Sequence, residues 1–253
     1  MTRVPRSLPG QLSLCWGSME GVGFRDFLAT AANAGFDAVT LNSALYEEAA
    51  DAGFSDRDIR NLLQDLNLSV SGIDPLFDWL PQAARLDGDD AISRCTRATA
   101  AEVFHIALAA GTDLVNAPLG LATPESEQQI VDCFGALCEQ AAAQNLRVSL
   151  EFMPFTAVRD LATAARIIEQ AGCDNGGIMF DCWHHHRAGG SPDDVLDIAP
   201  RRFFALQLDD ARAEPMDDMV EETLNHRLLP GAASTLYASW ATCTLAACRS
   251  SMM

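Results

Sequence analysis

Three short apolar runs in the second half of the chain decide its fold: residues 147–151 read RVSLE, residues 177–181 read GIMFD, and residues 203–209 read FFALQLD. Each run has the length of one buried strand. The runs end in side chains whose oxygens could bind a metal: Glu151, Asp181, Gln207 and Asp209. An ionised carboxylate at the end of a buried strand is costly unless a partner compensates its charge, and a divalent cation is a common partner. The runs therefore predict parallel strands with a metal centre where they end.

The alternation of strand and helix extends over most of the sequence. Apolar runs predict strands at residues 12–16, 37–42, 68–73, 113–117, 147–151, 177–181 and 203–208. Helical periodicity predicts helices at residues 24–34, 56–66, 89–110, 125–144, 158–171 and 192–198. Strict alternation indicates a parallel sheet with right-handed crossovers. Seven such units, with no G-x-G-x-x-G after any strand, favour a (β/α)8 TIM barrel of about 250 residues over a dinucleotide-binding fold.

The sequence predicts a single TIM-barrel domain over residues 1–253, with an N-terminal extension at residues 1–10. The eighth unit is atypical or incomplete, because residues 232–253 carry one charged residue and show neither a clear strand nor an amphipathic helix. This tail is either native or the product of a frame shift, and the sequence leaves both open. An incomplete barrel would expose a strand edge, which would allow a homo-oligomer.

Composition excludes several classes of partner. Lys and Arg number 17 against 35 Asp and Glu, a formal net charge of −18, which argues against nucleic acid and anionic membrane surfaces as partners. No apolar stretch is long enough to span a membrane, and no signal peptide is visible. The eight cysteines form no C-x-x-C pair, as expected for free thiols, so a cytoplasmic protein with a small-molecule substrate is expected.

Side-chain alternation along the strands places the polar groups together. Glu151 shares its strand face with Ser149, whereas Val148 and Leu150 share the opposite face, so the carboxylate is expected to point into the barrel or its mouth. Carboxylate and amide oxygens are hard ligands, which suit Mn²⁺, Mg²⁺ or Co²⁺. A lone buried carboxylate bonded to backbone or arginine is the alternative for each residue taken singly.

Other candidates follow the strands. His184 comes three residues after Asp181 and is expected to face the substrate or the metal, while its neighbours His185 and His186 fit a polar loop. Arg227 either holds a substrate oxygen or lies on the surface. The acidic, Met-rich segment 211–226 is equally consistent with a lid over the site and with a solvated loop.

Three more residues are candidates for substrate binding. Trp16 ends the first predicted strand, and Asp74 and Trp79 follow the third. An aromatic side chain in such a loop can stack on the face of a sugar. A small satellite core is the alternative for the group around Trp79.

The motifs resemble the xylose isomerase-like superfamily of barrels, the group of sugar phosphate isomerases and epimerases. The resemblance covers residues 11–231, and its matching pieces are residues 12–41, SLEF at 149–152, FDCWH at 180–184, LQLDD at 206–210 and RLLPG at 227–231. It implies a divalent metal held by Glu151, Asp181 and Gln207, with His184 and Arg227 contacting substrate. It also implies a fourth ligand, usually a Glu on strand eight, and the sequence has no Glu after position 222.

The main hypothesis is therefore a divalent-metal-dependent isomerase or epimerase that acts on a sugar, keto-sugar or related polyol through an enediolate-type intermediate. Glu151, His184 and Arg227 are its expected catalytic residues, and Mn²⁺ is its expected cofactor. The same site could support a keto-polyol dehydratase, since both reactions begin with enolate formation. A catalytically impaired sugar-binding barrel is the third hypothesis, because the fourth ligand is missing. An abasic-site endonuclease fits poorly, since basic clusters are lacking.

Overall fold

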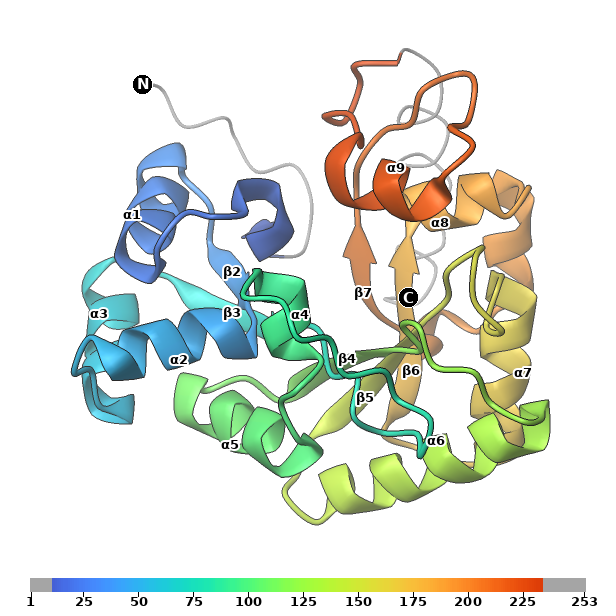
Figure 1. Cartoon of the computed structure of the whole chain (residues 1–253), viewed down its shortest axis with the longest axis horizontal. Coiled ribbons are helices and arrows are strands. Elements are labelled where there is room, and N and C mark those ends of the chain that lie inside the picture. Colours follow the sequence, from blue (N-terminus) through green and yellow to red (C-terminus); the bar gives the residue numbers. More distant parts are fainter. Residues whose placement is uncertain (1–10, 234–253) are drawn as a thin grey trace. The chain divides into compact units, whose positions relative to one another are not determined.

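The computed structural model describes residues 11–233, and these residues form two compact units (Figure 1). The first unit contains residues 11–78 and 85–116, and the second contains residues 79–84 and 117–233. The predicted extension at residues 1–10 lies outside the described residues, as does the predicted tail apart from residues 232 and 233. No helix in the described part of the chain is both long enough and apolar enough to cross a membrane.

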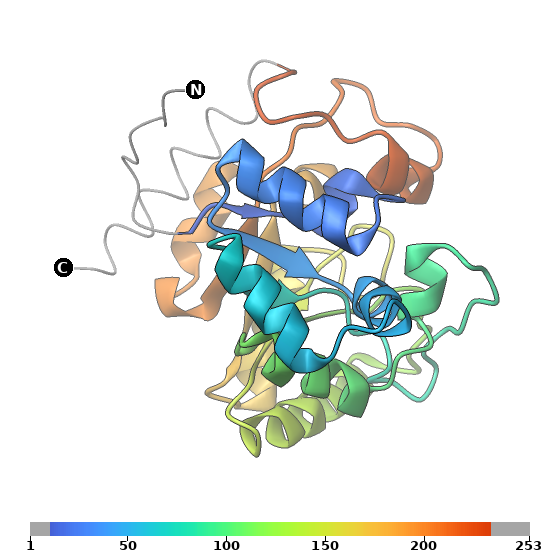
Figure 2. The same cartoon turned by 90° about the vertical axis from the view of Figure 1, so that its left-hand side faces the viewer.

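The first unit alternates parallel strands with helices, as predicted (Figure 2). Its strands are neighbours in sequence order: β1 (Ser13–Leu14), β2 (Ala38–Leu41), β3 (Ser69–Ile73) and β4 (Leu114–Pro118). Its helices are η1 (Trp16–Met19), α1 (Phe24–Ala34), α2 (Ser43–Asp51), α3 (Asp56–Asp65), α4 (Ala91–Cys95) and α5 (Ala100–Ala110). Ser55 caps α3, and its hydroxyl accepts from the backbone N–H of Asp58.

Three predictions for this unit are corrected. The helix expected over residues 89–110 is two helices, because Thr99 has extended backbone angles and forms a capping box with Glu102 that begins α5. The strand expected over residues 12–16 is shorter, and Trp16 lies in the 3₁₀ helix η1 instead. Helix α2 was not predicted, and the Asn42 side chain caps it by accepting from Leu45 N–H.

The second unit holds the strands quoted at the outset. Its strands are β5 (Arg147–Glu151), β6 (Gly176–Asp181) and β7 (Phe203–Gln207), which are parallel neighbours in that order. Its helices are α6 (Glu127–Ala142), α7 (Leu161–Ala171), α8 (Cys182–Arg187), η2 (Pro192–Asp197), η3 (Pro200–Arg202) and α9 (Met219–Asn225). The helix expected at residues 192–198 is thus a 3₁₀ helix, and the loop expected after the sixth strand is α8.

Strand β6 is the centre of this unit, and all six of its residues are buried. Such a strand reads as a continuous apolar run because both of its faces are covered. Gly177 is required for close packing, since a Cβ there would lie 2.6 Å from the ring of Phe204. Phe180 packs edge-on against Phe152 and Phe203, with ring centroids 5.9 and 6.0 Å away. This packing fixes β6 and therefore the position of Asp181 at its end.

Candidate metal and substrate site

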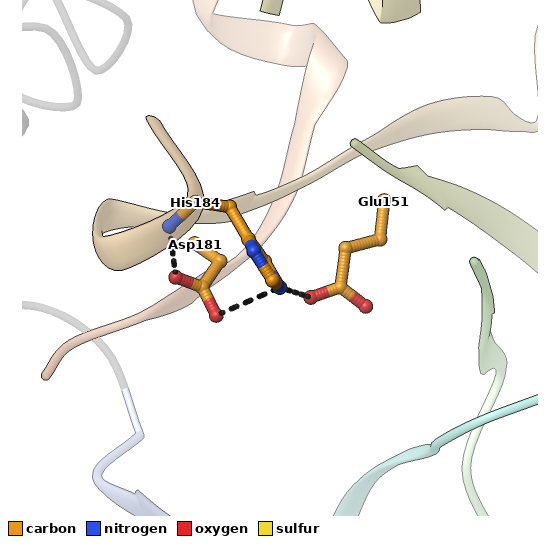
Figure 3. Close-up of side chains that lie close together, drawn as sticks. All are labelled: Glu151, Asp181 and His184. Atoms are coloured by element: carbon orange, nitrogen blue, oxygen red, sulfur yellow. Dashed lines mark hydrogen bonds and ion pairs between the residues drawn. The ribbon is translucent and has the colours of Figure 1, made fainter. Parts of the chain in front are cut away.

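Two strand ends and one helix of the second unit bring three predicted site residues together (Figure 3). Glu151 ends β5, Asp181 ends β6, and His184 lies in α8. His184 Nε2 lies 3.7 Å from Glu151 Oε1 and 3.8 Å from Asp181 Oδ2. One ligand atom from each residue lies within 4.8 Å of the others, and all three side chains are buried. The expected convergence of the strand-end carboxylates is therefore present in the structure.

Asp181 positions His184 through a helix cap. Its Oδ1 accepts a hydrogen bond of 3.0 Å from the backbone N–H of His184, so the residue that ends β6 also begins α8. The three-residue spacing puts both side chains on the same side of the first helical turn. His184 thus lies beside the strand-end carboxylates, but in a helix rather than in the expected loop, and its contact with metal or substrate stays a prediction.

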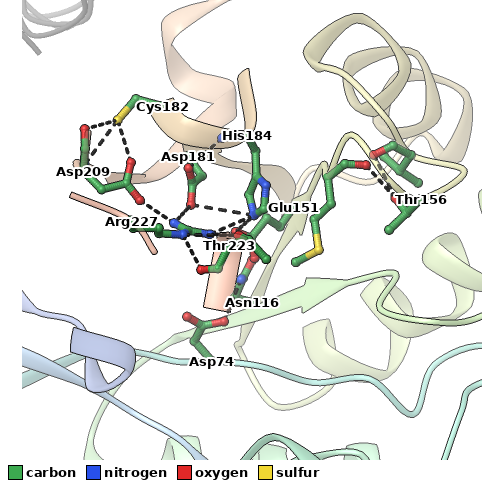
Figure 4. A network of polar contacts seen from close by, with 12 residues as sticks. Asp74, Asn116, Glu151, Thr156, Asp181, Cys182, His184, Asp209, Thr223 and Arg227 are labelled. Carbon is green, nitrogen blue, oxygen red and sulfur yellow. Dashed lines mark hydrogen bonds and ion pairs between the residues drawn. The ribbon is translucent and has the colours of Figure 1, made fainter. Parts of the chain in front are cut away.

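Arg227 reaches the same cluster from the segment after α9 (Figure 4). Its Nη1 donates to Asp181 Oδ2 at 2.5 Å and also to Asp209 Oδ2. Its Nη2 lies 3.2 Å from His184 Nε2. The guanidinium is oriented by Thr223, whose Oγ1 accepts from Nη2 at 2.7 Å. Arg227 therefore contacts the buried cluster through its guanidinium, while its side chain is 26% exposed.

The charges around the cluster set the protonation of His184. Burial, with a smaller contribution from the nearby Arg227 cation, lowers the pKa of His184 to about 4 against the opposing effect of Asp181. A neutral imidazole accepts at Nε2 from Arg227 and carries its proton on Nδ1. That Nδ1 is buried and has no hydrogen-bond partner among the described residues. Nε2 is consequently the ring nitrogen that faces the two carboxylates.

The two aspartates shift in opposite directions. Burial would raise the pKa of Asp181, but the charges of Arg227 and His184 hold it below its ordinary value. Burial and the neighbouring Asp181 raise the pKa of Asp209 to about 6. Asp209 also contacts the buried thiol of Cys182, with Oδ1 and Sγ 3.1 Å apart. Asp209 was expected at a strand end, but the sequence predicted no role for it in the site.

Gln207 ends β7, next to β6. It is the residue in register with Asp181, and its side chain is partly buried. The predicted third oxygen ligand therefore comes from the strand end adjacent to Asp181. Its role as a ligand stays a prediction.

The predicted substrate-binding residues Trp16 and Asp74 belong to the first unit. Trp16 is 9% exposed, and its indole N–H has no partner among the described residues. Asp74 follows β3 and accepts a hydrogen bond of 2.8 Å from the side-chain amide of Asn116. Their contact with substrate stays a prediction.

Trp79 has the contacts of a core residue. It is buried in the second unit, its indole N–H donates to the Pro118 carbonyl at 2.9 Å, and its ring meets Phe134 edge-on. The sequence left two interpretations of Trp79 open: stacking on a sugar, and packing in a small satellite core. These contacts favour the core.

The segment at residues 211–226 is largely exposed, but one buried residue anchors it. It contains α9, whose Glu222 is fully buried and accepts from Arg187 Nε at 3.1 Å and from the backbone N–H of Met216 at 2.8 Å. His185 is likewise buried, with Nε2 3.1 Å from the Ser191 carbonyl, so its expected place in a polar loop is wrong. No sequence pattern identified Glu222, whose partner Arg187 lies 35 positions away, or Thr223, which contacts Arg227 just beyond the end of α9.

The chain belongs to the family of xylose isomerase-like TIM barrels, whose model matches residues 28–240. This family and the solved structures below confirm the predicted TIM-barrel fold, with seven strands among residues 11–233 and no clear eighth unit there. The prediction of one domain over the whole chain stays a prediction.

Curated relatives are enzymes. The chain is 30% identical over 109 residues to an inosose isomerase of Halalkalibacterium halodurans, covering 42% of this chain and 38% of that protein. It is 27% identical over 226 residues to a 3-dehydroshikimate dehydratase of Pseudomonas aeruginosa, covering 87% of this chain and 34% of that protein. The chain thus spans little more than a third of the length of these relatives.

Solved structures share the fold. A xylose isomerase-like TIM barrel/4-hydroxyphenylpyruvate dioxygenase fusion protein matches with a TM-score of 0.77 and 25% identity, over 94% of this chain and 37% of that chain. The IOLI protein with a bound zinc atom matches with a TM-score of 0.78 and 16% identity, over 94% of this chain and 85% of that chain. These similarities place the strand-end cluster at the edge where TIM barrels carry their active sites.

Proposed function

We propose that this chain is a divalent-metal-dependent isomerase or epimerase that acts on a sugar, keto-sugar or related polyol through an enediolate-type intermediate. The observation that carries the proposal is the buried cluster of Glu151, Asp181 and His184 at adjoining strand ends. Such a cluster of titratable groups at the carboxyl ends of barrel strands is where this fold performs chemistry.

The donor atoms fit a divalent cation. Two carboxylates and one unprotonated imidazole nitrogen approach one another within 4.8 Å in a buried site. Glu151 and Asp181 would hold the ion, with Gln207 at the neighbouring strand end as a further oxygen ligand. When bound, the ion would polarise a substrate carbonyl and acidify the carbon beside it. We propose Mn²⁺ as the ion, with Mg²⁺ and Co²⁺ as alternatives suited to the same oxygen-rich set.

Three side chains would transfer the proton and bind the substrate. Glu151 would take the proton from the carbon beside the carbonyl and, in an isomerisation, return it to the neighbouring carbon. His184, neutral at physiological pH, would hold a substrate oxygen. Arg227 would stabilise the negative charge that develops on the substrate.

A keto-polyol dehydratase is the second candidate. The alignment with the 3-dehydroshikimate dehydratase covers 87% of this chain, which is twice the 42% covered by the alignment with the inosose isomerase. Dehydration begins with the same proton abstraction and then expels a hydroxyl group from the next carbon. Glu151 would therefore serve as the base in either reaction.

Deuterium exchange tests the proposal and separates the two reactions. The Mn²⁺-loaded chain is incubated in D2O with a panel of inososes, keto-sugars and 3-dehydroshikimate, and each mixture is followed by ¹H NMR and ultraviolet absorbance. Exchange beside the carbonyl that is lost in Glu151→Gln supports the proposal. New carbon–carbon double-bond absorbance selects the dehydratase, and a Mn²⁺-bound protein without exchange on any compound would leave a non-catalytic barrel.

A further inference from the structure

The candidate ligand atoms of the cluster are already satisfied by a cation from the chain itself. Of the three donors that approach one another, Asp181 Oδ2 accepts from Arg227 Nη1 at 2.5 Å and His184 Nε2 lies 3.2 Å from Arg227 Nη2. The forked guanidinium thus uses two of the three atoms that a divalent ion would use (Figure 4).

We propose that Arg227 is the resident cation of the metal-free site, and that a divalent ion must displace it from Asp181 and His184 in order to bind. This inference rests on the proposed function, because it takes Glu151 and Asp181 as residues that hold the ion.

Asp181 has no spare oxygen that would let both cations bind without interference. Its Oδ1 caps α8 by accepting from the His184 backbone N–H, so only Oδ2 faces the cluster. A divalent ion and a guanidinium on the same oxygen would repel each other strongly in a buried site. One of the two must therefore give way, and the hydrogen-bonded side chain is the one that can move.

Asp209 is the carboxylate with which Arg227 can remain paired after it leaves Asp181. It already accepts from Arg227 Nη1 through Oδ2, and it is not among the three residues of the cluster. Asp181 and Asp209 together present two carboxylates to the single guanidinium of Arg227. A divalent ion on Asp181 therefore leaves Arg227 paired with Asp209.

Displacement also sets an order of events. While Arg227 bridges Asp181 and Asp209, its fork is occupied by the protein's own carboxylates. When Arg227 leaves Asp181 and His184, the N–H groups of Nη1 and Nη2 that had contacted them become available to a substrate oxygen. The metal is therefore expected to bind before the substrate, and the substrate is expected to bind weakly to the metal-free protein.

Calorimetric titration of Mn²⁺ into the metal-stripped full chain tests the inference without any activity measurement. Arg227→Met removes the competing cation and is expected to bind Mn²⁺ about tenfold or more tightly than the wild type, because a charged hydrogen-bonded contact no longer has to be broken. Arg227→Lys keeps the charge but cannot fork to two atoms, so its affinity should be intermediate. Arg166→Met is the matched control, since Arg166 loses the same charge from an exposed pair with Glu127.

Thermal unfolding supplies a second readout, and Thr223→Val a second variant if Arg227→Met folds poorly. Metal-free Arg227→Met should melt below the wild type, with a larger rise on saturation with Mn²⁺. Thr223→Val removes a hydroxyl that holds Nη2 and should tighten Mn²⁺ by a few-fold. Equal or weaker Mn²⁺ affinity in both variants would overturn the inference alone. Absence of Mn²⁺ binding in the wild type and every variant would overturn the proposed metal dependence and the inference with it.

Discussion

Two arginines of the second unit are held by buried carboxylates, and the balance of charge differs between them. Within residues 11–233, Arg187 forms an ion pair with Glu222 alone, whereas Arg227 pairs with both Asp181 and Asp209. Both guanidiniums also lie near the ring of Trp183, at 5.6 and 5.3 Å from its centroid. The two arginines differ in exposure, since the Arg187 side chain is 4% exposed and that of Arg227 is 26% exposed, and they differ in the number of carboxylates.

A balanced pair and an unbalanced cluster have different consequences. The Arg187–Glu222 pair is neutral, and it ties α8 to α9 with further bonds to the Arg212 carbonyl and the Met216 N–H. Arg227 instead lies between two carboxylates, so Asp181 and Asp209 together exceed its single positive charge. Buried surplus charge is unfavourable unless a further cation binds. The first arrangement therefore suits a structural anchor, and the second suits a cation site.

Glu151→Gln is expected to have the largest effect. It should lower kcat by about 100- to 10,000-fold on whichever substrate the deuterium screen identifies, because the amide cannot accept the proton. Arg227 keeps its two carboxylate partners, Asp181 and Asp209, in this variant, so the metal-free protein should lose less stability than it does in Glu222→Gln. Steady-state kinetics and chemical denaturation measure the two effects.

Glu169→Gln, at an exposed position of α7, is the control for Glu151→Gln and should change neither quantity. A Glu151→Gln protein that retains wild-type turnover would remove Glu151 from the chemistry. One that is markedly less stable would show that Glu151 stabilises the fold instead.

Glu222→Gln should clearly lower the stability of the metal-free protein. It leaves the buried Arg187 without its countercharge, which costs about 3–5 kcal/mol of unfolding free energy. Chemical denaturation of the metal-free protein measures this loss, and Glu221→Gln, an exposed neighbour in α9, should change it by no more than about 0.5 kcal/mol. If Glu222→Gln costs less than Glu151→Gln, the contrast between the two arginines is wrong.

The sequence predicted the carboxylates of this site better than it predicted their partners. Glu151 and Asp181 end apolar runs, and parallel strands place such ends at one edge, so their convergence follows from local pattern alone. Arg227 is 46 positions from Asp181 and reaches it only through α9, which no local pattern records. Helix α8 was missed because Asp181 both ends a strand and caps the helix, and the pattern revealed only the first of these roles.

The protonation of His184 gives a third test. Its folded-state pKa of about 4 is below the ordinary 6.5, so the unfolded state binds the proton more readily and stability falls as the pH falls from about 6.5 towards 4. Asp209, with its pKa raised to about 6, opposes this trend over an overlapping range. The comparison of wild type with His184→Gln isolates the histidine: between pH 7 and pH 5 the wild type should lose about 2 kcal/mol relative to the variant. Parallel stability curves for the two proteins would mean that His184 titrates normally.

Thr223→Val is expected to have the smallest effect on stability, and it tests how Arg227 is held in the cluster. Thr223 Oγ1 accepts from Arg227 Nη2 at 2.7 Å and from Nε at 3.2 Å, while the Thr223 carbonyl still accepts from Nε in the variant. The metal-free protein should therefore lose only about 1 kcal/mol, as expected for one hydrogen bond to a charged group in a partly buried place. Thr223→Ser keeps the hydroxyl and should match the wild type. A loss that persists at saturating Mn²⁺ would mean that Arg227 keeps its metal-free position, whereas a loss that shrinks would mean that the ion has moved it away from Thr223.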